Sequence, residues 1–182
     1  VVATSDAGNG VGYTGFRIRG SAGTSINVML NGVPYNDSES QGTFFVNIPD
    51  MASSASQIVI QRGVGTSSNG TASFGASVNI LTKNPDEKPY VLGQFSAGSF
   101  NTMKTSFEAG SGKFLNNLLS VSARYSTINS DGYIDRAFSK LNSYNINALF
   151  EKGNTKLRFL TFGGKEKTYQ AWNGIDRQTW ET

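Results

Sequence analysis

The sequence contains no cysteine and no histidine among its 182 residues. Their absence excludes Cys/His zinc sites, Ser-His-Asp triads, cysteine nucleophiles and histidine general bases. The nearest pair of carboxylates, Asp37 and Glu39, lies in a polar Asn/Ser turn, whereas acid-base catalysis needs a pocket that raises the pKa of one member. We therefore predict that the protein is not an enzyme and that it holds no metal or cofactor.

Charge and long apolar runs are also scarce. Charged residues make up 16% of the chain, the formal net charge is +3, and no run of five or more like charges occurs, so no nucleic-acid partner is expected. No apolar stretch approaches the roughly 20 residues of a membrane helix, and residues 1–5 lack the basic and apolar regions of a signal peptide. If the chain crosses a membrane, it must do so with β-strands.

Glycine, serine, asparagine and aromatic residues are abundant instead, and one glycine-rich loop separates two apolar segments. Residues 65–70 (GTSSNG) have the glycine spacing of a phosphate-binding loop, but Thr71 and Ala72 stand where that motif requires Lys and Ser or Thr. Residues 76–82 (ASVNILT) are small or β-branched, which predicts a strand and not the helix of a phosphate site. The region therefore reads as strand, glycine loop, strand.

The chain changes character at residues 84–89 (NPDEKP), which contain two of the four prolines and three consecutive charges and indicate a linker. Before it, the segments Ile26–Leu30 and 56–60 predict short strands separated by turns. Asp50 is a candidate N-cap for a helix of one or two turns at Met51–Ser54. We expect a small α+β module over residues 1–84.

After the linker, apolar and polar residues alternate over long segments. Met103, Thr105, Phe107 and Ala109 share one strand face, while Lys104 and its polar neighbours share the other. The same alternation recurs at residues 119–126 and 144–151, and Gly153-Asn154 predicts a hairpin into residues 156–162. Up to five antiparallel strands of about ten residues suit a transmembrane barrel better than a soluble sandwich, but the alternation alone leaves a sandwich or an extracellular β-solenoid open.

Four ordered motifs carry a resemblance to a known family. They are residues 16–20 (FRIRG), 28–35 (VMLNGVPY), 58–63 (IVIQRG) and 74–82 (FGASVNILT). Together they resemble the plug domain of TonB-dependent outer-membrane receptors, in order and at natural spacing. Residues 36–50 further resemble the iron-complex-uptake branch of that family, as in Bacteroidetes-type sequences. The resemblance runs from about Gly12 through the first barrel strands.

The resemblance implies an α+β plug module followed by antiparallel transmembrane β-barrel strands. Such barrels have about 22 strands, so the chain is expected to hold the C-terminal part of a plug at residues 1–84 and the first, incomplete strands of the barrel at 85–182. Nothing before Gly12 resembles the segment that binds TonB. The implied function is TonB-dependent transport of a ferric siderophore or other iron complex across the outer membrane of a Gram-negative bacterium. Vitamin B12 and oligosaccharides remain alternative substrates, and a β-rich surface adhesin remains an alternative function.

The resemblance also implies site residues. Arg19 and Arg62 stand where family arginines contact acidic residues of the barrel wall, a lock between plug and barrel, and a guanidinium suits such charge-assisted bonds. The expected structural glycines of the plug are Gly20, Gly32, Gly63 and Gly75. Candidate ligand-facing residues are Asp37, Glu39, Ser67, Asn69 and Trp172. Partners expected from the family are TonB, an iron complex and the lipid of the outer membrane.

Overall fold

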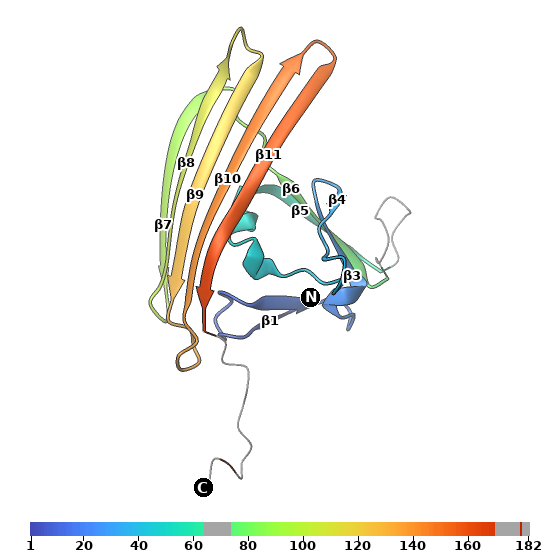
Figure 1. Cartoon of the computed structure of the whole chain (residues 1–182), viewed down its shortest axis with the longest axis vertical. Helices are drawn as coiled ribbons and strands as arrows, with labels where there is room; N and C mark the ends of the chain where they lie inside the picture. Colours follow the sequence, from blue (N-terminus) through green and yellow to red (C-terminus); the bar gives the residue numbers. More distant parts are fainter. Residues whose placement is uncertain (64–73, 170–178, 180–182) are drawn as a thin grey trace.

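The computed structural model describes residues 1–63, 74–169 and 179, and two β-sheets dominate it (Figure 1). The larger sheet has five long strands in the order β11-β10-β9-β8-β7 and forms a curved wall. We call this sheet the wall and the described residues up to Thr82 the inner module. The strands of the wall are β7 (Pro89–Gly98), β8 (Thr102–Phe114), β9 (Leu119–Ser130), β10 (Ser139–Lys152) and β11 (Thr155–Thr168).

The inner module is built around a four-stranded sheet in the order β4-β3-β6-β5. Strands β3 and β6 pair in parallel, and the other neighbours pair antiparallel. A separate hairpin and three short 3₁₀ helices complete it. Its elements are β1 (Val2–Ser5), β2 (Thr14–Arg17), η1 (Gly23–Ser25), β3 (Ile26–Leu30), β4 (Val33–Pro34), η2 (Phe45–Asn47), η3 (Met51–Ser54), β5 (Ala55–Arg62) and β6 (Ala76–Thr82).

The core of the inner module comes from the β-branched and aliphatic residues that predict its strands. Residues from β3 and β6 pack with Ile18, Ile48 and Met51 to form one buried cluster. Its members are Ile18, Ile26, Val28, Ile48, Met51, Ala76, Val78 and Ile80. Burial of this apolar surface is the main driving force that holds the module together.

The segment around the glycine loop has the predicted order of elements. Strands β5 and β6 pair antiparallel on either side of the loop, and a strand, not a helix, begins at Ala76. Gly63 directly follows β5 and has φ +85°, a conformation that glycine adopts without the steric cost of a Cβ. A Cβ on Gly75 would lie 2.3 Å from the Cβ of Ser21, so the chains approach closely there. Residues 64–73 of the loop lie outside the described residues.

The wall contains the five antiparallel strands that the alternation indicates, and they are 10 to 14 residues long. The predicted hairpin is present, because Lys152 pairs with Thr155 across Gly153-Asn154. The strands extend further than expected because their ends carry polar residues that break the alternation while the pairing continues. Such lengths suffice to cross a bilayer as tilted strands.

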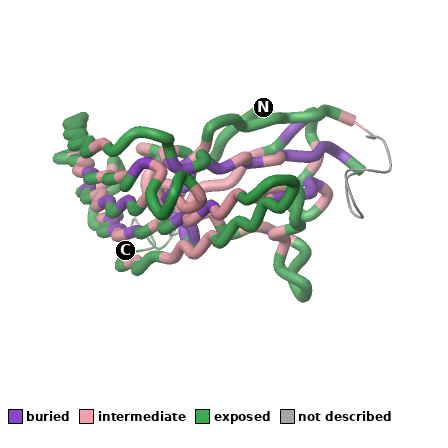
Figure 2. Tube along the Cα trace, turned by 90° about the horizontal axis from the view of Figure 1, so that it is seen from above, coloured by how far each residue is buried: buried purple, intermediate pink, exposed green. Residues whose placement is uncertain are grey.

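The direction of the two faces separates the barrel from the sandwich. Most of the large apolar side chains of the wall point away from the inner module, with Phe107 61% and Leu157 62% exposed, while Leu141 and Leu149 are buried on the inner face. The opposite face is polar, and Ser106 and Ser126 are only 2% and 1% exposed. Figure 2 shows buried and exposed residues alternating along these strands. A sandwich would bury its apolar face, whereas a membrane barrel turns that face outward.

An aromatic row crosses the outer face of the wall. Phe107, Tyr125 and Tyr144 are neighbours in register on β8, β9 and β10. The row ends on glycines at both sides, because Phe107 pairs with Gly93 and Tyr144 pairs with Gly163. Each ring lies against its glycine, where a Cβ would be 3.6 Å from Phe107 and 2.9 Å from Tyr144. The rings therefore cover backbone that the glycines leave bare.

Residues 83–88 connect the two sheets and contain no strand or helix. They lie where the linker is predicted, although the domain boundary at residue 84 stays a prediction. Lys113 of β8 holds this segment to the wall through a salt bridge of 2.8 Å to Glu87. None of the helices in the described part of the chain is long and apolar enough to span a membrane.

One local prediction is wrong. A short helix does follow Asp50, but the side chain of Asp50 does not cap it, and Asp50 has the left-handed backbone conformation with φ 55°. Aspartate tolerates this conformation better than most residues. The consequence is that the carboxylate turns away from the helix amides and toward the wall.

Candidate functional site

The inner module meets the wall at a row of small residues. Ser106, Ser126, Ser143 and Gly164 are neighbours in register on β8, β9, β10 and β11, and the side chains of the three serines are buried. Pro49 packs against the end of this row, because a Cβ on Gly164 would lie 2.7 Å from the Pro49 ring. The small side chains create the space in which the Pro49-Asp50 corner approaches the wall.

Asp50 makes the densest set of contacts between the two parts. Lys104 Nζ donates to Asp50 Oδ1 at 2.5 Å, and Ser126 Oγ donates to Oδ2 at 2.6 Å. Arg124 Nη2 forms an ion pair and hydrogen bond with the same Oδ2. Within the inner module, Ser53 Oγ donates to Oδ1 at 2.6 Å. We call the set of bonds from Lys104, Arg124 and Ser126 to this carboxylate the Asp50 contact.

The two cations of the Asp50 contact are oriented entirely toward η3. Arg124 Nη1 donates to Ser54 Oγ at 3.0 Å and to the backbone oxygen of Asp50 at 3.3 Å. Lys104 Nζ also donates to Ser53 Oγ at 2.6 Å. The side chains of Arg124 and Asp50 are 6% and 5% exposed, so this is a buried ion pair and not a surface one. Loss of one partner from such a pair leaves a buried, uncompensated charge.

The environment of Asp50 favours its ionised form. Burial alone would raise the pKa of the carboxyl, but hydrogen bonds from Lys104, Ser126 and Ser53 and the charge of Arg124 outweigh it, so the pKa is lowered from its ordinary value. The carboxylate is therefore charged at every pH above the range in which an unfolded aspartate titrates, about 3.9.

This shift predicts how stability depends on pH. Because the pKa of Asp50 is lower in the folded state, its contribution is complete above the unfolded value and is lost as the pH falls through the folded pKa. We expect the difference in melting temperature between wild type and Asp50→Asn to stay constant from pH 7 to about pH 5 and to shrink only below about pH 4. Calorimetry of the intact protein measures it. A difference that already disappears between pH 7 and about pH 5 would contradict the assignment.

A second polar contact joins the end of β6 to the wall. Arg158 Nη2 of β11 donates to Thr82 Oγ1 at 2.6 Å and to the backbone oxygen of Lys83 at 2.8 Å. Asn147 of β10 donates to the same Lys83 oxygen at 2.5 Å. Asn31, in the turn after β3, donates to Thr82 Oγ1 at 3.0 Å and ties that turn to the contact. This contact and the Asp50 contact therefore both use side chains from the polar face of the wall.

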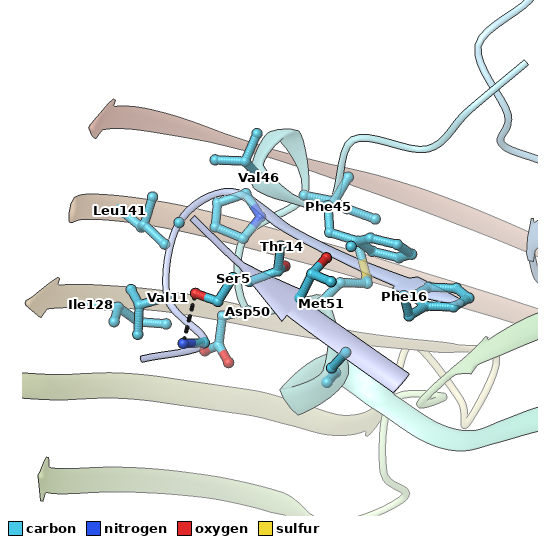
Figure 3. A pocket seen from close by; sticks show the side chains of 18 of the residues that line it. Ser5, Val11, Thr14, Phe16, Phe45, Val46, Asp50, Met51, Ile128 and Leu141 are labelled. Carbon is cyan, nitrogen blue, oxygen red and sulfur yellow. Dashed lines mark hydrogen bonds between the residues drawn. The ribbon is translucent and has the colours of Figure 1, made fainter. Parts of the chain in front are cut away.

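A cavity of about 940 Å³ lies beside the Asp50 contact (Figure 3). It is lined by the β1–β2 hairpin, helices η2 and η3, strands β5 and β6 and the wall residues Ile128 and Leu141. Most of the side chains that line it are apolar, including Phe16, Phe45 and Met51. Asp50 is the only ionisable side chain among the described residues that line it. The chemistry of the region is therefore concentrated at Asp50.

Arg19 and Arg62, the predicted lock residues, lie apart from the Asp50 contact. Arg19 occupies a tight turn with φ 50°, and Arg62 ends strand β5. Both are exposed, and neither forms an ion pair with another described residue. Their role as a lock stays a prediction. Within the described chain the charge arrangement is the reverse of the predicted one, with the acid on the inner module and the cations on the wall.

Some of the other predicted site residues are described by the structure, and the rest lie outside the described residues. Asp37 and Glu39 are exposed in the turn between β4 and η2. Asp37 accepts bonds from the backbone and hydroxyl of Ser40, which lower the pKa of its carboxyl, so it shapes its own turn. Gly20 and Gly32 both have φ +81°. Ser67, Asn69 and Trp172 lie outside the described residues.

Sequence reasoning missed Lys104, Arg124 and Ser126 as site residues and assigned Asp50 the wrong role. Lys104 and Arg124 do lie on the predicted polar faces of their strands. A cation on the inner face of a barrel strand needs a counter-charge, and this requirement could have marked Lys104 and Arg124 as site residues. Its partner was not predictable, because Asp50 is 54 residues from Lys104 in sequence. No group of three or more acidic residues that could hold a metal ion occurs in the described ranges.

The geometry identifies the class of protein. A wall with an apolar outer face, a polar inner face and a separate folded module seated on the polar face defines a plugged β-barrel. Within that class, the family model of the TonB-dependent Receptor Plug Domain matches residues 1–77. The inner module therefore matches the plug domain of TonB-dependent receptors, and the chain has the fold of a plugged-barrel fragment. No curated protein sequence matches the chain.

Solved structures of receptors share the fold. The pyoverdine outer membrane receptor FpvA from Pseudomonas aeruginosa PAO1 is 15% identical with a TM-score of 0.66, over 85% of this chain and 23% of that one. The ferric yersiniabactin uptake receptor FyuA from Yersinia pestis is 16% identical with a TM-score of 0.63, over 85% and 25%. The copper transporter OprC is 15% identical with a TM-score of 0.70, over 86% and 25%. The chain thus spans about a quarter of each of these proteins.

Proposed function

We propose that the chain is part of a TonB-dependent transporter that moves a scarce nutrient across the outer membrane of a Gram-negative bacterium. The observation that carries this proposal is a plug held on the polar face of a wall whose other face is apolar. A plug in this position blocks the lumen, so transport requires an energy source that displaces or rearranges it. In this proposal TonB supplies that energy from the inner membrane, and the wall is embedded in the lipid of the outer membrane.

An iron complex, such as a ferric siderophore, is the proposed substrate. FpvA is described as bound to pyoverdine and FyuA as a receptor for ferric yersiniabactin, while OprC is described as a copper transporter. These proteins support metal complexes as the substrate class. Vitamin B12 and oligosaccharides are the alternatives that the same experiment tests.

The Asp50 contact is the proposed attachment that must open during transport. It concentrates three wall residues on one plug carboxylate, at the start of a helix of only four residues whose Met51 also packs in the buried cluster. Arg19 and Arg62 are proposed as a second lock toward barrel strands other than β7–β11. Both locks use charge-assisted hydrogen bonds, which a polar, confined lumen strengthens.

The proteins similar in fold are described as receptors and a transporter, which supports a function without covalent chemistry. A β-rich surface adhesin without transport is the competing proposal. It accounts for an outward apolar face, but it gives no reason for a plug domain on the inner face of the wall.

Uptake by the intact parent protein tests the proposal. Cells carrying it should accumulate radiolabelled ferric complexes only when TonB is present, and Arg62→Ala should alter uptake at an unchanged surface level if Arg62 locks the plug. Lys88→Ala, an exposed cation in the linking segment, is the matched control and should behave as wild type. Absence of TonB-dependent uptake of iron complexes, cobalamin and glycans would favour the adhesin.

A further inference from the structure

The wall side of the Asp50 contact has the form of a carboxylate-binding site. Lys104 projects from β8, and Arg124 and Ser126 project from β9, and all three reach the two oxygens of one carboxylate. Lys104 lies diagonally across the Ser106–Ser126 pair from Arg124. We call Lys104, Arg124 and Ser126 the cradle. Among the described residues, the only carboxylate that receives hydrogen bonds from the cradle is that of Asp50.

Movement of η3 away from the wall would leave the cradle positively charged. Within the described part of the chain, the side-chain bonds of Lys104 and Arg124 go only to Asp50, Ser53 and Ser54. The acid on the neighbouring strand position is Glu108, which pairs with Arg124 in register. Once Asp50 has left, Lys104, Arg124 and Glu108 together carry a net charge of +1 at this place on the wall.

Glu108 is already occupied by other groups. Its Oε1 accepts a hydrogen bond of 2.6 Å from the Tyr90 hydroxyl, and its Oε2 lies 3.9 Å from Lys83 Nζ. It therefore does not replace Asp50 without breaking contacts of its own. The neighbouring row of serines and Gly164 provides space for an incoming group once Pro49 has moved.

We propose that the cradle is a transit site for carboxylate-bearing metal complexes, which Asp50 occupies while the plug is closed. This inference rests on the proposed transport function and names the chemical class of its substrate. When the plug moves, a carboxylate of the cargo takes the place of the Asp50 carboxylate. Binding of a cargo carboxylate would pair both cations again after Asp50 has left, which lowers the cost of the uncompensated charge.

The cradle selects a carboxylate by its geometry. One oxygen receives the ammonium of Lys104, and the other receives the guanidinium of Arg124 and the hydroxyl of Ser126. A neutral hydroxamate complex offers no such charge and gains little from these donors, since bonds to an ionised acceptor are about twice as strong as bonds to a neutral one. The cradle should therefore favour anionic cargo over neutral cargo of similar size.

Chemical rescue tests the site without any transport assay. In the intact purified receptor, Asp50→Ala empties the cradle, and sodium acetate should then raise the melting temperature more than sodium chloride at equal ionic strength. Wild type should show no such difference. Adding Arg124→Gln to Asp50→Ala should weaken acetate binding about tenfold, the effect of one lost charge-assisted hydrogen bond. Equal effects of acetate and chloride on Asp50→Ala would overturn the inference.

Uptake of two radiolabelled complexes tests the role in transit. In an Asp50→Asn background, where the plug has already lost its ionic attachment, Arg124→Gln should reduce uptake of a ferric tricarboxylate and leave uptake of a neutral ferric trihydroxamate unchanged. Lys140→Gln, on the outward face of β10, is the matched control. Equal loss for both complexes would overturn the transit role. If wild type takes up neither complex with TonB, the proposed iron-complex substrate fails, while acetate rescue would still identify a carboxylate site.

Discussion

Replacing Asp50 with asparagine is expected to loosen the plug from the wall by about 3–5 kcal/mol, the cost of leaving buried charges unpaired. Asparagine has nearly the same shape and still accepts hydrogen bonds, so the effect isolates the charge. Arg124 and Lys104 would both face an uncharged group in a place where the Arg124 side chain is 6% exposed. The substitution removes the counter-charge of both cations at once.

Hydrogen exchange of the intact receptor measures this loss locally. Exchange of the amides in η3 should rise by two orders of magnitude or more, because about 1.4 kcal/mol corresponds to a tenfold change. The amides of β7 and β8 should be unaffected. Asp37→Asn is the matched control, because Asp37 is exposed and its carboxylate contacts only its own turn. Similar exchange of η3 in wild type and Asp50→Asn would mean that the plug is held elsewhere.

A double variant separates the ion pair from the rest of the contact. Asp50→Asn combined with Arg124→Gln removes both charges of the closest pair, so the double variant should be less destabilised than the sum of the two single variants. Lys104 remains and keeps part of the penalty, because it also donates to Asp50. Strict additivity would show that Asp50 and Arg124 act independently despite their hydrogen bond.

Alternation along the strands was enough to predict the wall. Residues such as Met103 and Phe107 on one face and Lys104 and Ser106 on the other require a strand with two different environments. The direction of the faces was not contained in the alternation, since a sandwich and a barrel produce the same pattern. It follows from the structure, in which Phe107 is exposed and Ser106 is buried against the plug side.

The site was harder to predict than the fold because its members are close only in space. Asp50 follows a proline and precedes a short helix, and local reasoning correctly placed that helix while giving the carboxylate a capping role. Tertiary contacts outweighed this local preference, since two cations and a serine hydroxyl on the wall bind the carboxylate more strongly than helix amides would. Arg124, 74 residues away, cannot be paired with Asp50 from a single sequence.

Alanine at Gly164 is expected to push the plug away from the wall and to destabilise it by about 1–3 kcal/mol, the usual cost of overpacking. A Cβ at this position would lie 2.6 Å from the backbone oxygen of Asn142 and 2.7 Å from the Pro49 ring. The backbone oxygen belongs to the neighbouring strand and does not rotate away. Pro49 must therefore move, and Asp50, which follows it, moves with it and lengthens its bonds to the cradle.

Gly93→Ala is the matched control for this prediction. Gly93 also lies within a wall strand, but its added Cβ would meet Phe107 at 3.6 Å, an ordinary contact on the outer face. Alanine there should be neutral or slightly stabilising, because it restricts the unfolded chain. Thermal unfolding and hydrogen exchange of η3 in the intact receptor should both respond to Gly164→Ala and not to Gly93→Ala. An equal response would mean that the row of small residues does not set the distance between plug and wall.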